Sequence, residues 1–460
     1  MRQVVVEATQ PTGSEPQLVI AALVGIAVIV GLITWLKVHP FLALLLGGLT
    51  TGLVAGEAAP KVVESFTTGF GDTSASVGIL IGLGGMYGRL LADSGGAGTI
   101  VDTLVARAGK KSLPWIMGLI GALIGLPMFF EIGLVLLVPI ILLVAKRARV
   151  PLMSVAIPTL AGLSAMHGFV PPHPGPLVAI SSLKANLGDT LILGIVVAIP
   201  TVVIAGPLLS YVIRKLVPVE APDSQFDVEA SGDEPRPPFA FALISVLLPV
   251  VLLLVGAIGD IVAPDSDAAW KALLDFVGTP IVALTIALIG GFLLLALPAR
   301  MDRARISTTL TEALPPIAGI LLIVGAGGGF KQVLVDTGIG EVIANVAQGE
   351  GIGALLVAWA VAAIIRVATG SATVATVTAA GIVQPLTDGM APQMVALMVL
   401  AVGAGSVFLS HVNDAGFWLV SQYFKLSIAQ TLKSWSLMEC VVSVAGLGAV
   451  VTAALVLGVA

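Results

Sequence analysis

Apolar runs of about twenty residues, separated by short charged loops, dominate this sequence of 460 residues. A helix of about 20 residues crosses the ~30 Å hydrocarbon core of a bilayer, so such runs indicate membrane-spanning helices. With 57% hydrophobic and only 11% charged residues, the chain has more apolar surface than one soluble core can bury. It is predicted to be an all-α polytopic membrane protein with ten crossings, at residues 18–36, 40–56, 73–92, 151–187, 190–213, 239–262, 275–297, 311–335, 391–425 and 436–460.

Charge and cysteine content exclude several other classes. The formal net charge is −5 and no basic stripe is present, which argues against nucleic acid as a partner. The single cysteine, Cys440, rules out disulfides, thiolate metal sites and iron–sulfur clusters. We therefore expect no metal and no cofactor.

Two further apolar stretches, 113–145 and 351–388, are too long for one helix and too short for two. Each is broken near its middle, at 125–127 by GLP and at 369–373 by TGSAT. Broken backbone at membrane depth is tolerated only where protein or a watery cavity satisfies its polar groups. We predict two re-entrant hairpins whose tips face a site; kinked ordinary helices are the alternative.

Lysine and arginine cluster in loops that this topology places on one side, which is taken as cytoplasmic. Both termini are then extracytoplasmic, and residues 1–17 form a tail without the features of a removable signal peptide. The polar stretch 217–238 is predicted to be a cytoplasmic linker between two halves, 18–216 and 239–460.

An internal repeat supports this division. GGMYGRLLADSG, at 84–95, matches GGGFKQVLVDTG, at 327–338, in its glycines, an aromatic residue, a leucine, an aspartate and a hydroxyl residue. An odd number of crossings in each half makes the two copies inverted. The predicted fold is therefore two inverted repeats of about five transmembrane helices, each with one hairpin, an architecture typical of secondary transporters.

The first hairpin tip, GLPMFFEIG, places Glu131 among apolar residues. An acid at mid-membrane costs about 2.5–3.5 kcal/mol on insertion scales, so it requires a partner, a proton or a cavity. Glu131 is the favoured candidate proton carrier, and Phe129 is a candidate substrate contact. A structural carboxylate bonded to amides of its own hairpin is the alternative for Glu131.

The segment AMHGFVPPHPGPLVAIS, at 165–181, contains four prolines and is predicted to be unwound within the membrane. His167 and His173 would then lie beside exposed carbonyl groups, suited to binding a hydroxylated ligand or relaying protons. His173 is assigned to substrate and His167 to proton coupling. A purely structural role stays open for both.

The second tip places Ser371, Thr373 and Thr376 beside Gly370, where a helix is expected to break. The amides and partial positive charge of a new helix N-terminus suit a carboxylate, so all four residues are assigned to substrate binding. Each hydroxyl alone commonly bonds its own helix instead. Arg366 is a rare intramembrane cation that requires an anionic substrate or, as we favour, an internal acid.

The segment SHVNDAGFW places His411, Asn413 and Asp414 in one polar patch between apolar runs. Asn413 and Asp414 are candidates to bond a polyol, and Asp414 is the second candidate proton carrier. Arg89 and Asp93, at i and i+4, are predicted to form a structural ion pair instead.

Four stretches, GLPMFFEIG, HGFVPPHPGP, ATGSATVATVTAAG and SHVNDAGFWLV with the following TLKSWSLME, together resemble the gluconate:proton symporter (gluconate permease) family of bacterial inner-membrane carriers. The resemblance covers nearly the whole chain. It implies uptake of gluconate or a related acid with protons, in an ion-transporter superfamily fold whose hairpin-bearing core moves against a scaffold that commonly dimerises in the lipid. Members differ in substrate, which includes other aldonates and D-serine. The family's tips lack the SNT signature of sodium sites, as do both tips here, which favours protons.

Two alternatives stay open. One is a sodium-coupled dicarboxylate or other organic-anion carrier of similar architecture. The other is an intramembrane hydrolase using serine or histidine with Asp414; the sequence shows no nucleophile elbow, HExxH motif or paired catalytic aspartates to support it.

Overall fold

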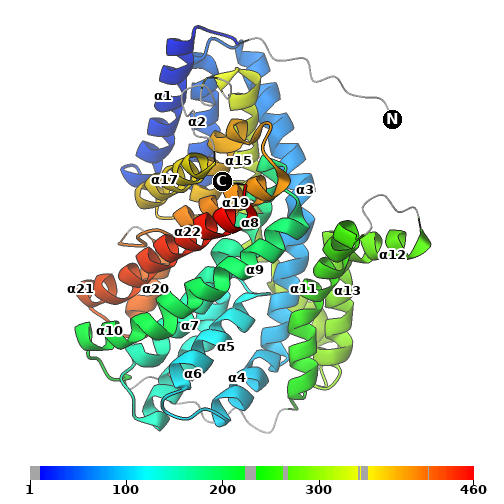
Figure 1. Cartoon of the computed structure of the whole chain (residues 1–460), viewed down its shortest axis with the longest axis vertical. Helices are drawn as coiled ribbons and strands as arrows, with labels where there is room; N and C mark the ends of the chain where they lie inside the picture. Colours follow the sequence, from blue (N-terminus) through cyan, green and yellow to red (C-terminus); the bar gives the residue numbers. More distant parts are fainter. Residues whose placement is uncertain are drawn as a thin grey trace.

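The computed structural model describes residues 11–222, 235–262, 268–339, 342, 351–412 and 414–459, and all regular structure in these ranges is helical (Figure 1). The first half contains α1 (Glu15–Thr34), α2 (Pro40–Val54), α3 (Ala59–Asp93), α4 (Gly96–Ala106), α5 (Leu113–Gly125), α6 (Phe130–Ala148), α7 (Met153–Phe169), α8 (Pro174–Leu183), α9 (Leu187–Val203), η1 (Ile204–Leu208) and α10 (Leu209–Leu216).

The second half contains α11 (Phe239–Val262), α12 (Ala269–Gly278), α13 (Pro280–Gly291), η2 (Phe292–Ala296), α14 (Arg303–Glu312), α15 (Leu314–Asp336), α17 (Ile352–Thr369), α18 (Ala372–Val383), η3 (Gln384–Thr387), α19 (Pro392–Ser406), α20 (Ala415–Tyr423), α21 (Ile428–Thr431), η4 (Leu432–Ser436) and α22 (Leu437–Leu457). Within the predicted linker 217–238, residues 223–234 lie outside the described residues, as do 1–10 of the predicted tail.

Eight helical runs of the described chain are long and apolar enough to cross a membrane, or nine if the pair α12 and α13–η2, bent by 72°, counts as one span. Most predicted crossings correspond to these runs, but some lengths differ. The predicted crossings 40–56 and 391–425 contain α2 and α19, each only 15 residues long. The crossing predicted from residue 73 begins earlier, because α3 starts at Ala59 and remains helical through the polar residues before 73.

Both predicted helix breaks occur. The chain leaves α5 at Gly125 and begins α6 at Phe130, while α17 and α18 are separated only by Gly370 and Ser371. α17 has 18 residues, enough to cross a membrane by itself. The breaks are therefore observed, whereas the re-entrant path of the two arms stays a prediction.

The two copies of the repeated motif end their helices in the same way. Arg89 Nε donates to Asp93 Oδ2 at 2.9 Å near the end of α3, and Gln332 Nε2 donates to Asp336 Oδ1 at 2.8 Å near the end of α15. The glycine two residues after each aspartate has a left-handed φ, +74° and +76° respectively. The aligned sequences thus build matching helix ends.

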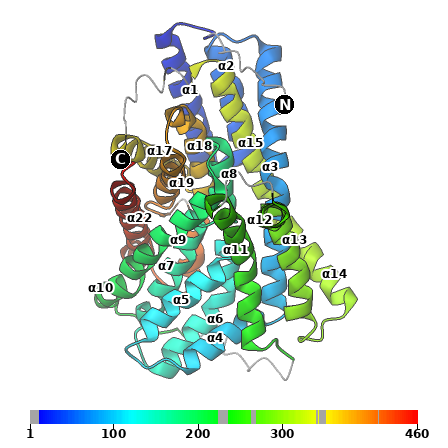
Figure 2. The same ribbon diagram turned by 45° about the vertical axis from the view of Figure 1, so that its right-hand side comes forward.

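α3 and α15 cross closely and run in opposite directions (Figure 2). A Cβ added to Gly69 would lie 2.3 Å from the carbonyl oxygen of Gly328, so the crossing requires glycine. The start of α15 lies at the end of α3, where Arg89 Nη2 contacts Glu312 Oε2 at 2.7 Å. This antiparallel pair is the contact expected between two inverted copies.

Candidate functional site

The helices around the four chain breaks pack against one another across the two halves. α8 contacts α18, and α7 contacts α19. A Cβ on Gly403 of α19 would lie 2.1 Å from the carbonyl oxygen of Gly168 of α7. The four breaks follow α5, α7, α17 and α19, and these contacts bring the breaks after α7, α17 and α19 into one region.

The proline-rich segment is unwound only over residues 170–173, so the prediction of unwinding from 165 to 181 was too wide. α7 continues to Phe169 because the blocking prolines, Pro171 and Pro172, come after it. Pro174 and Pro176 lie in the first turn of α8, where the missing N–H groups have no helical partner to lose. His167 is accordingly in the last turn of α7.

His173 precedes α8 and reaches the first hairpin tip. Its side chain is buried, and Nε2 lies 2.5 Å from the carbonyl oxygen of Gly125, the last residue of α5. A carbonyl only accepts, so Nε2 carries the proton and donates it. Nδ1 of His173 has no hydrogen-bond partner among the described residues. The histidine thus supplies a hydrogen-bond donor to a carbonyl that has no donor within its own helix, because it lies at the helix end.

Phe129 precedes α6 and is buried in an apolar cluster that includes Leu177 of α8 and Val377 of α18. It therefore connects the first tip with the second half. Glu131 is the second residue of α6. Its side chain lies outside what the structure describes.

The second tip is a sharp connection between two helices. Gly370 has φ +74°, and Ser371 caps α18 by accepting a hydrogen bond from the amide of Val374 at 3.3 Å. Ser371 and Thr373 are half-buried, whereas Thr376 is buried and donates its hydroxyl proton to the carbonyl of Ala372. The polar groups left for a ligand are those nearest the break.

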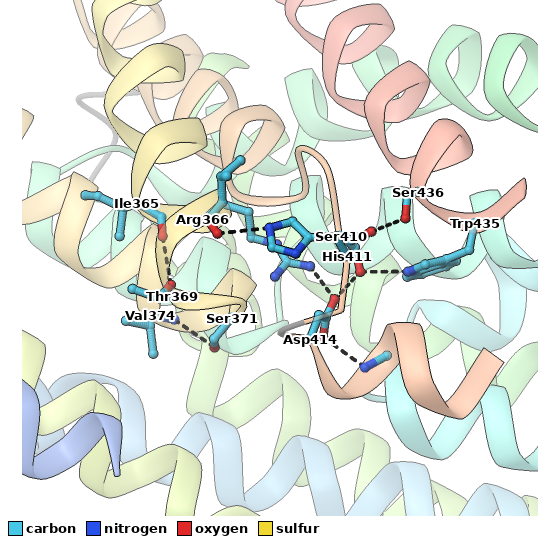
Figure 3. Close-up of polar contacts among 12 residues, drawn as sticks. Ile365, Arg366, Thr369, Ser371, Val374, Ser410, His411, Asp414, Trp435 and Ser436 are labelled. Atoms are coloured by element: carbon cyan, nitrogen blue, oxygen red, sulfur yellow. Dashed lines mark hydrogen bonds and ion pairs between the residues drawn. The ribbon is translucent and has the colours of Figure 1, made fainter. Parts of the chain in front are cut away.

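Arg366, which is buried, and Asp414, which is half-buried, form an ion pair with Nη2 2.5 Å from Oδ2 (Figure 3). Arg366 is 3% exposed. Asp414 precedes α20, where its Oδ1 accepts from the amide of Gly416 at 2.8 Å and its Oδ2 also accepts from the hydroxyl of Ser410. The intramembrane cation therefore has an internal acid as its partner.

Ser410 connects this pair to the last helices of the chain. Trp435 Nε1 donates to the Ser410 hydroxyl at 2.6 Å, and the hydroxyl of Ser436 donates to the Ser410 carbonyl (Figure 3). His411 Nε2 lies 3.1 Å from the carbonyl oxygen of Val367, to which it donates. Asn413 lies outside the described residues.

A chain of ring contacts joins the first tip to this cluster. The rings of His173 and His167 are 5.5 Å apart, those of His167 and Phe130 are 6.5 Å apart, and those of Phe130 and Trp435 are 5.2 Å apart. The predicted histidines are therefore linked to Asp414 by a series of contacts that runs through Phe130, Trp435 and Ser410.

Glu439 is a buried acid in the same region that the sequence analysis did not select. It lies on α22, one turn after Trp435, and interacts electrostatically with Arg366 and Asp414. The signal was present in the sequence, because an acid inside the apolar run 436–460 carries the same cost as Glu131.

Long apolar helices enclosing buried charged groups define this chain as a multi-pass membrane permease. Residues 17–456 match the model for GntP family permeases, and the chain belongs to that family. It is 47% identical over 96% of its length to a gluconate permease of Pseudomonas aeruginosa, covering 98% of that protein.

Two further relatives are from Escherichia coli. The chain is 41% identical to a high-affinity gluconate transporter and 39% identical to the Gnt-II system L-idonate transporter, in each case over 94% of this chain and 97% of the relative. Among solved structures, the YdaH transporter of Alcanivorax borkumensis matches with TM-score 0.62 and 17% identity, over 96% of this chain and 98% of that one. That likeness concerns the fold.

Proposed function

We propose that this chain imports gluconate or a related sugar acid across the bacterial cytoplasmic membrane by proton symport. The observation that carries the proposal is its 47% identity, over 96% of the chain, to a protein named gluconate permease. Relatives named for gluconate and for L-idonate point to sugar acids as the substrate class. The buried polar groups around the four breaks support a site for such an anion.

In this proposal the substrate carboxylate binds at the start of α18. Ser371 and Thr373 are half-buried there, and the free amides of a helix N-terminus favour an anion. Gly370 forms the sharp turn and Thr376 supports it through its bond to Ala372. We assign the substrate hydroxyls to His173, Asn413 and Asp414, and the apolar side of the carbon chain to Phe129.

Coupling follows from charge. A sugar-acid anion brings one negative charge into a region of low dielectric constant, and a proton bound at the same time compensates that charge. Glu131, Asp414 and His167 are the carriers that the sequence suggests. Asp414 is already held by Arg366, which makes it the weaker of the two acids for this role.

Alternating access would be elevator-like. A core formed by α5 to α8 and α17 to α20 would move against a scaffold of the other helices, through which two chains would dimerise in the lipid. The termini of both chains would be extracytoplasmic. Short contacts such as that of Gly168 with Gly403 would keep the core rigid as it moves.

Uptake of radiolabelled gluconate into proteoliposomes tests the proposal. An inward proton gradient is expected to drive accumulation, a protonophore to abolish it, and replacement of sodium by choline to leave it unchanged. Loss of uptake in choline would instead indicate a sodium-coupled carrier. Chemically altered gluconate inside the vesicles would indicate an enzyme.

A matched pair of variants tests the carboxylate site. Thr373→Val removes a hydroxyl at the second tip, whereas Thr67→Val removes an exposed hydroxyl of α3 whose partners among the described residues are carbonyls of its own helix. Losing a hydrogen bond to a charged group costs about 1.5–3 kcal/mol, so KM for gluconate is expected to rise about tenfold or more in Thr373→Val alone. Equal KM values in the two variants would contradict the assignment.

A further inference from the structure

Glu439 is an acid without full hydrogen bonding in the interior of the protein. It is the third residue of α22 and is 2% exposed. Ser164 of α7 hydrogen-bonds to its carboxyl group. The other oxygen, Oε1, has no partner among the described residues.

Arg366, which interacts electrostatically with Glu439, also has unused hydrogen-bonding capacity. Its Nη2 is bonded to Asp414, but Nε and Nη1 have no partners within the described part of the chain. One buried cluster therefore contains a cation, two acids, two unused donors and one unused acceptor.

The charges of this cluster are balanced when it binds one proton. With Arg366, Asp414 and Glu439 all ionised, the sum is +1 − 2 = −1, and one bound proton makes it zero. Uncompensated charge is costly in the protein interior, and a bound sugar-acid anion adds one more negative charge, so substrate binding favours uptake of that proton. Asp414 accepts from Arg366, Ser410 and the Gly416 amide, whereas Oε1 of Glu439 has no donor among the described residues. We therefore assign the proton to Glu439.

The elements packed against α22 contribute few other ionisable groups. α19 and η1 carry none, and α17 contributes Arg366. Asp414, just before α20, also interacts electrostatically with Glu439. The remaining ones on the packed elements are His167 on α7, Asp189 in the first turn of α9 and Lys433 in η4. On α22 itself, Cys440 follows Glu439 and interacts with it electrostatically.

We propose that Glu439 binds the transported proton, with Arg366 and Asp414 fixing the charge of its surroundings. This inference rests on the proposed function, proton-coupled import of a sugar acid. α22 belongs to the proposed scaffold, whereas α17 and α20 belong to the proposed core. The proton-binding group therefore lies at the boundary along which core and scaffold would move apart. Neutral Glu439 no longer attracts the guanidinium across that boundary, and the loaded core is freed to move.

The test compares wild type with Glu439→Gln and with Glu64→Gln, which neutralises an exposed acid of α3. Glutamine keeps the shape and the uncharged state of the protonated acid. Glu439→Gln is expected to lose at least tenfold in gradient-driven gluconate accumulation but to keep exchange of internal for external gluconate. Glu64→Gln is expected to match wild type in both assays.

A second readout is proton uptake by the purified protein on adding gluconate, followed with a pH indicator in weakly buffered solution. Wild type and Glu64→Gln are expected to take up about one proton per gluconate bound, and Glu439→Gln none. Wild-type accumulation or proton uptake in Glu439→Gln would overturn the inference, as would the expected pattern appearing in Glu131→Gln instead.

Glu439→Asp covers the case in which glutamine also abolishes exchange. Restored accumulation with aspartate supports the inference, because only an ionisable group restores coupling; failure of aspartate to restore it overturns the inference. A wild-type protein that does not transport gluconate refutes the proposed function, which is a separate outcome.

Discussion

In both halves, the residue just before a short helix contacts the end of an earlier helix, but the two contacts differ in chemistry. In the first half, His173 precedes α8 and bonds back to the carbonyl of Gly125 at the end of α5. In the second half, Asp414 precedes α20 and bonds back to Arg366 near the end of α17. In each case the residue before a short helix holds the first arm of the broken pair.

The difference between these contacts is charge. A hydrogen bond from an imidazole N–H to a carbonyl fixes geometry without adding charge to the interior. The ion pair of Arg366 with Asp414 lies near a second acid, Glu439. The net charge of this cluster therefore changes whenever it binds or releases a proton. In this account, the histidine contact in the first half positions the first hairpin tip, and the charged cluster in the second half couples transport to the proton.

The largest expected effect comes from breaking the ion pair. Arg366→Ala leaves the half-buried Asp414 without its partner, which costs up to about 3–5 kcal/mol, the range for a fully buried pair. Uptake is expected to fall below detection, and thermal unfolding in detergent to occur at lower temperature. The double variant Arg366→Gln with Asp414→Asn should recover part of the thermal stability, because it removes both charges; a double variant no more stable than Arg366→Ala would contradict the pairing.

A smaller effect is expected at Ser410, which holds Asp414 and accepts from Trp435. Ser410→Ala removes both bonds and should cost about 2–3 kcal/mol. We expect a lower unfolding temperature together with a changed pH dependence of uptake. Ser421→Ala is the control and should leave the pH profile as in wild type, because the Ser421 hydroxyl donates to the Leu426 carbonyl and has no other partner among the described residues.

The first half should respond differently. His173→Ala removes the bond to Gly125 and should cost about 1–2 kcal/mol, since a buried carbonyl loses its donor. The maximal uptake rate is expected to fall, but the pH dependence of the remaining activity is expected to match wild type. A shifted pH profile would place titration in the first half and weaken the comparison.

The smallest effects belong to the matching ends of α3 and α15. Arg89 and Gln332 make equivalent, partly exposed bonds to Asp93 and Asp336. Replacing Gln332 by alanine, or replacing Arg89 by alanine in a Glu312→Gln background that removes its second ion pair, should cost about 0.2–1 kcal/mol. Chemical-denaturation midpoints are expected to shift slightly and by similar amounts. A large loss for one variant alone would show that the two ends are not equivalent.

Much of the fold follows from local signals in the sequence. Hydropathy identifies the long helices, and Gly125 and Gly370 mark the breaks because glycine and proline weaken helices. Not every such residue breaks one, since Pro139 and Pro158 lie inside the continuous helices α6 and α7. The sequence also indicates that Arg366 needs an acid. Sequence does not show how far α7 continues before its prolines, since tertiary packing stabilises the last turn to Phe169.

The site is less predictable, since its contacts join residues far apart along the chain. Arg366 and Asp414 are 48 residues apart, as are His173 and Gly125. No local pattern selects these partners from the other polar residues. Glu439 was overlooked for another reason: it sits in an apolar run that looks like an ordinary crossing.

Simultaneous recording of proton and gluconate fluxes in proteoliposomes containing the wild-type protein tests the central claim most directly. One titrating cluster in the second half predicts equal fluxes, about one proton for each gluconate, whenever either gradient drives transport. Gluconate flux with no accompanying proton flux would contradict the account.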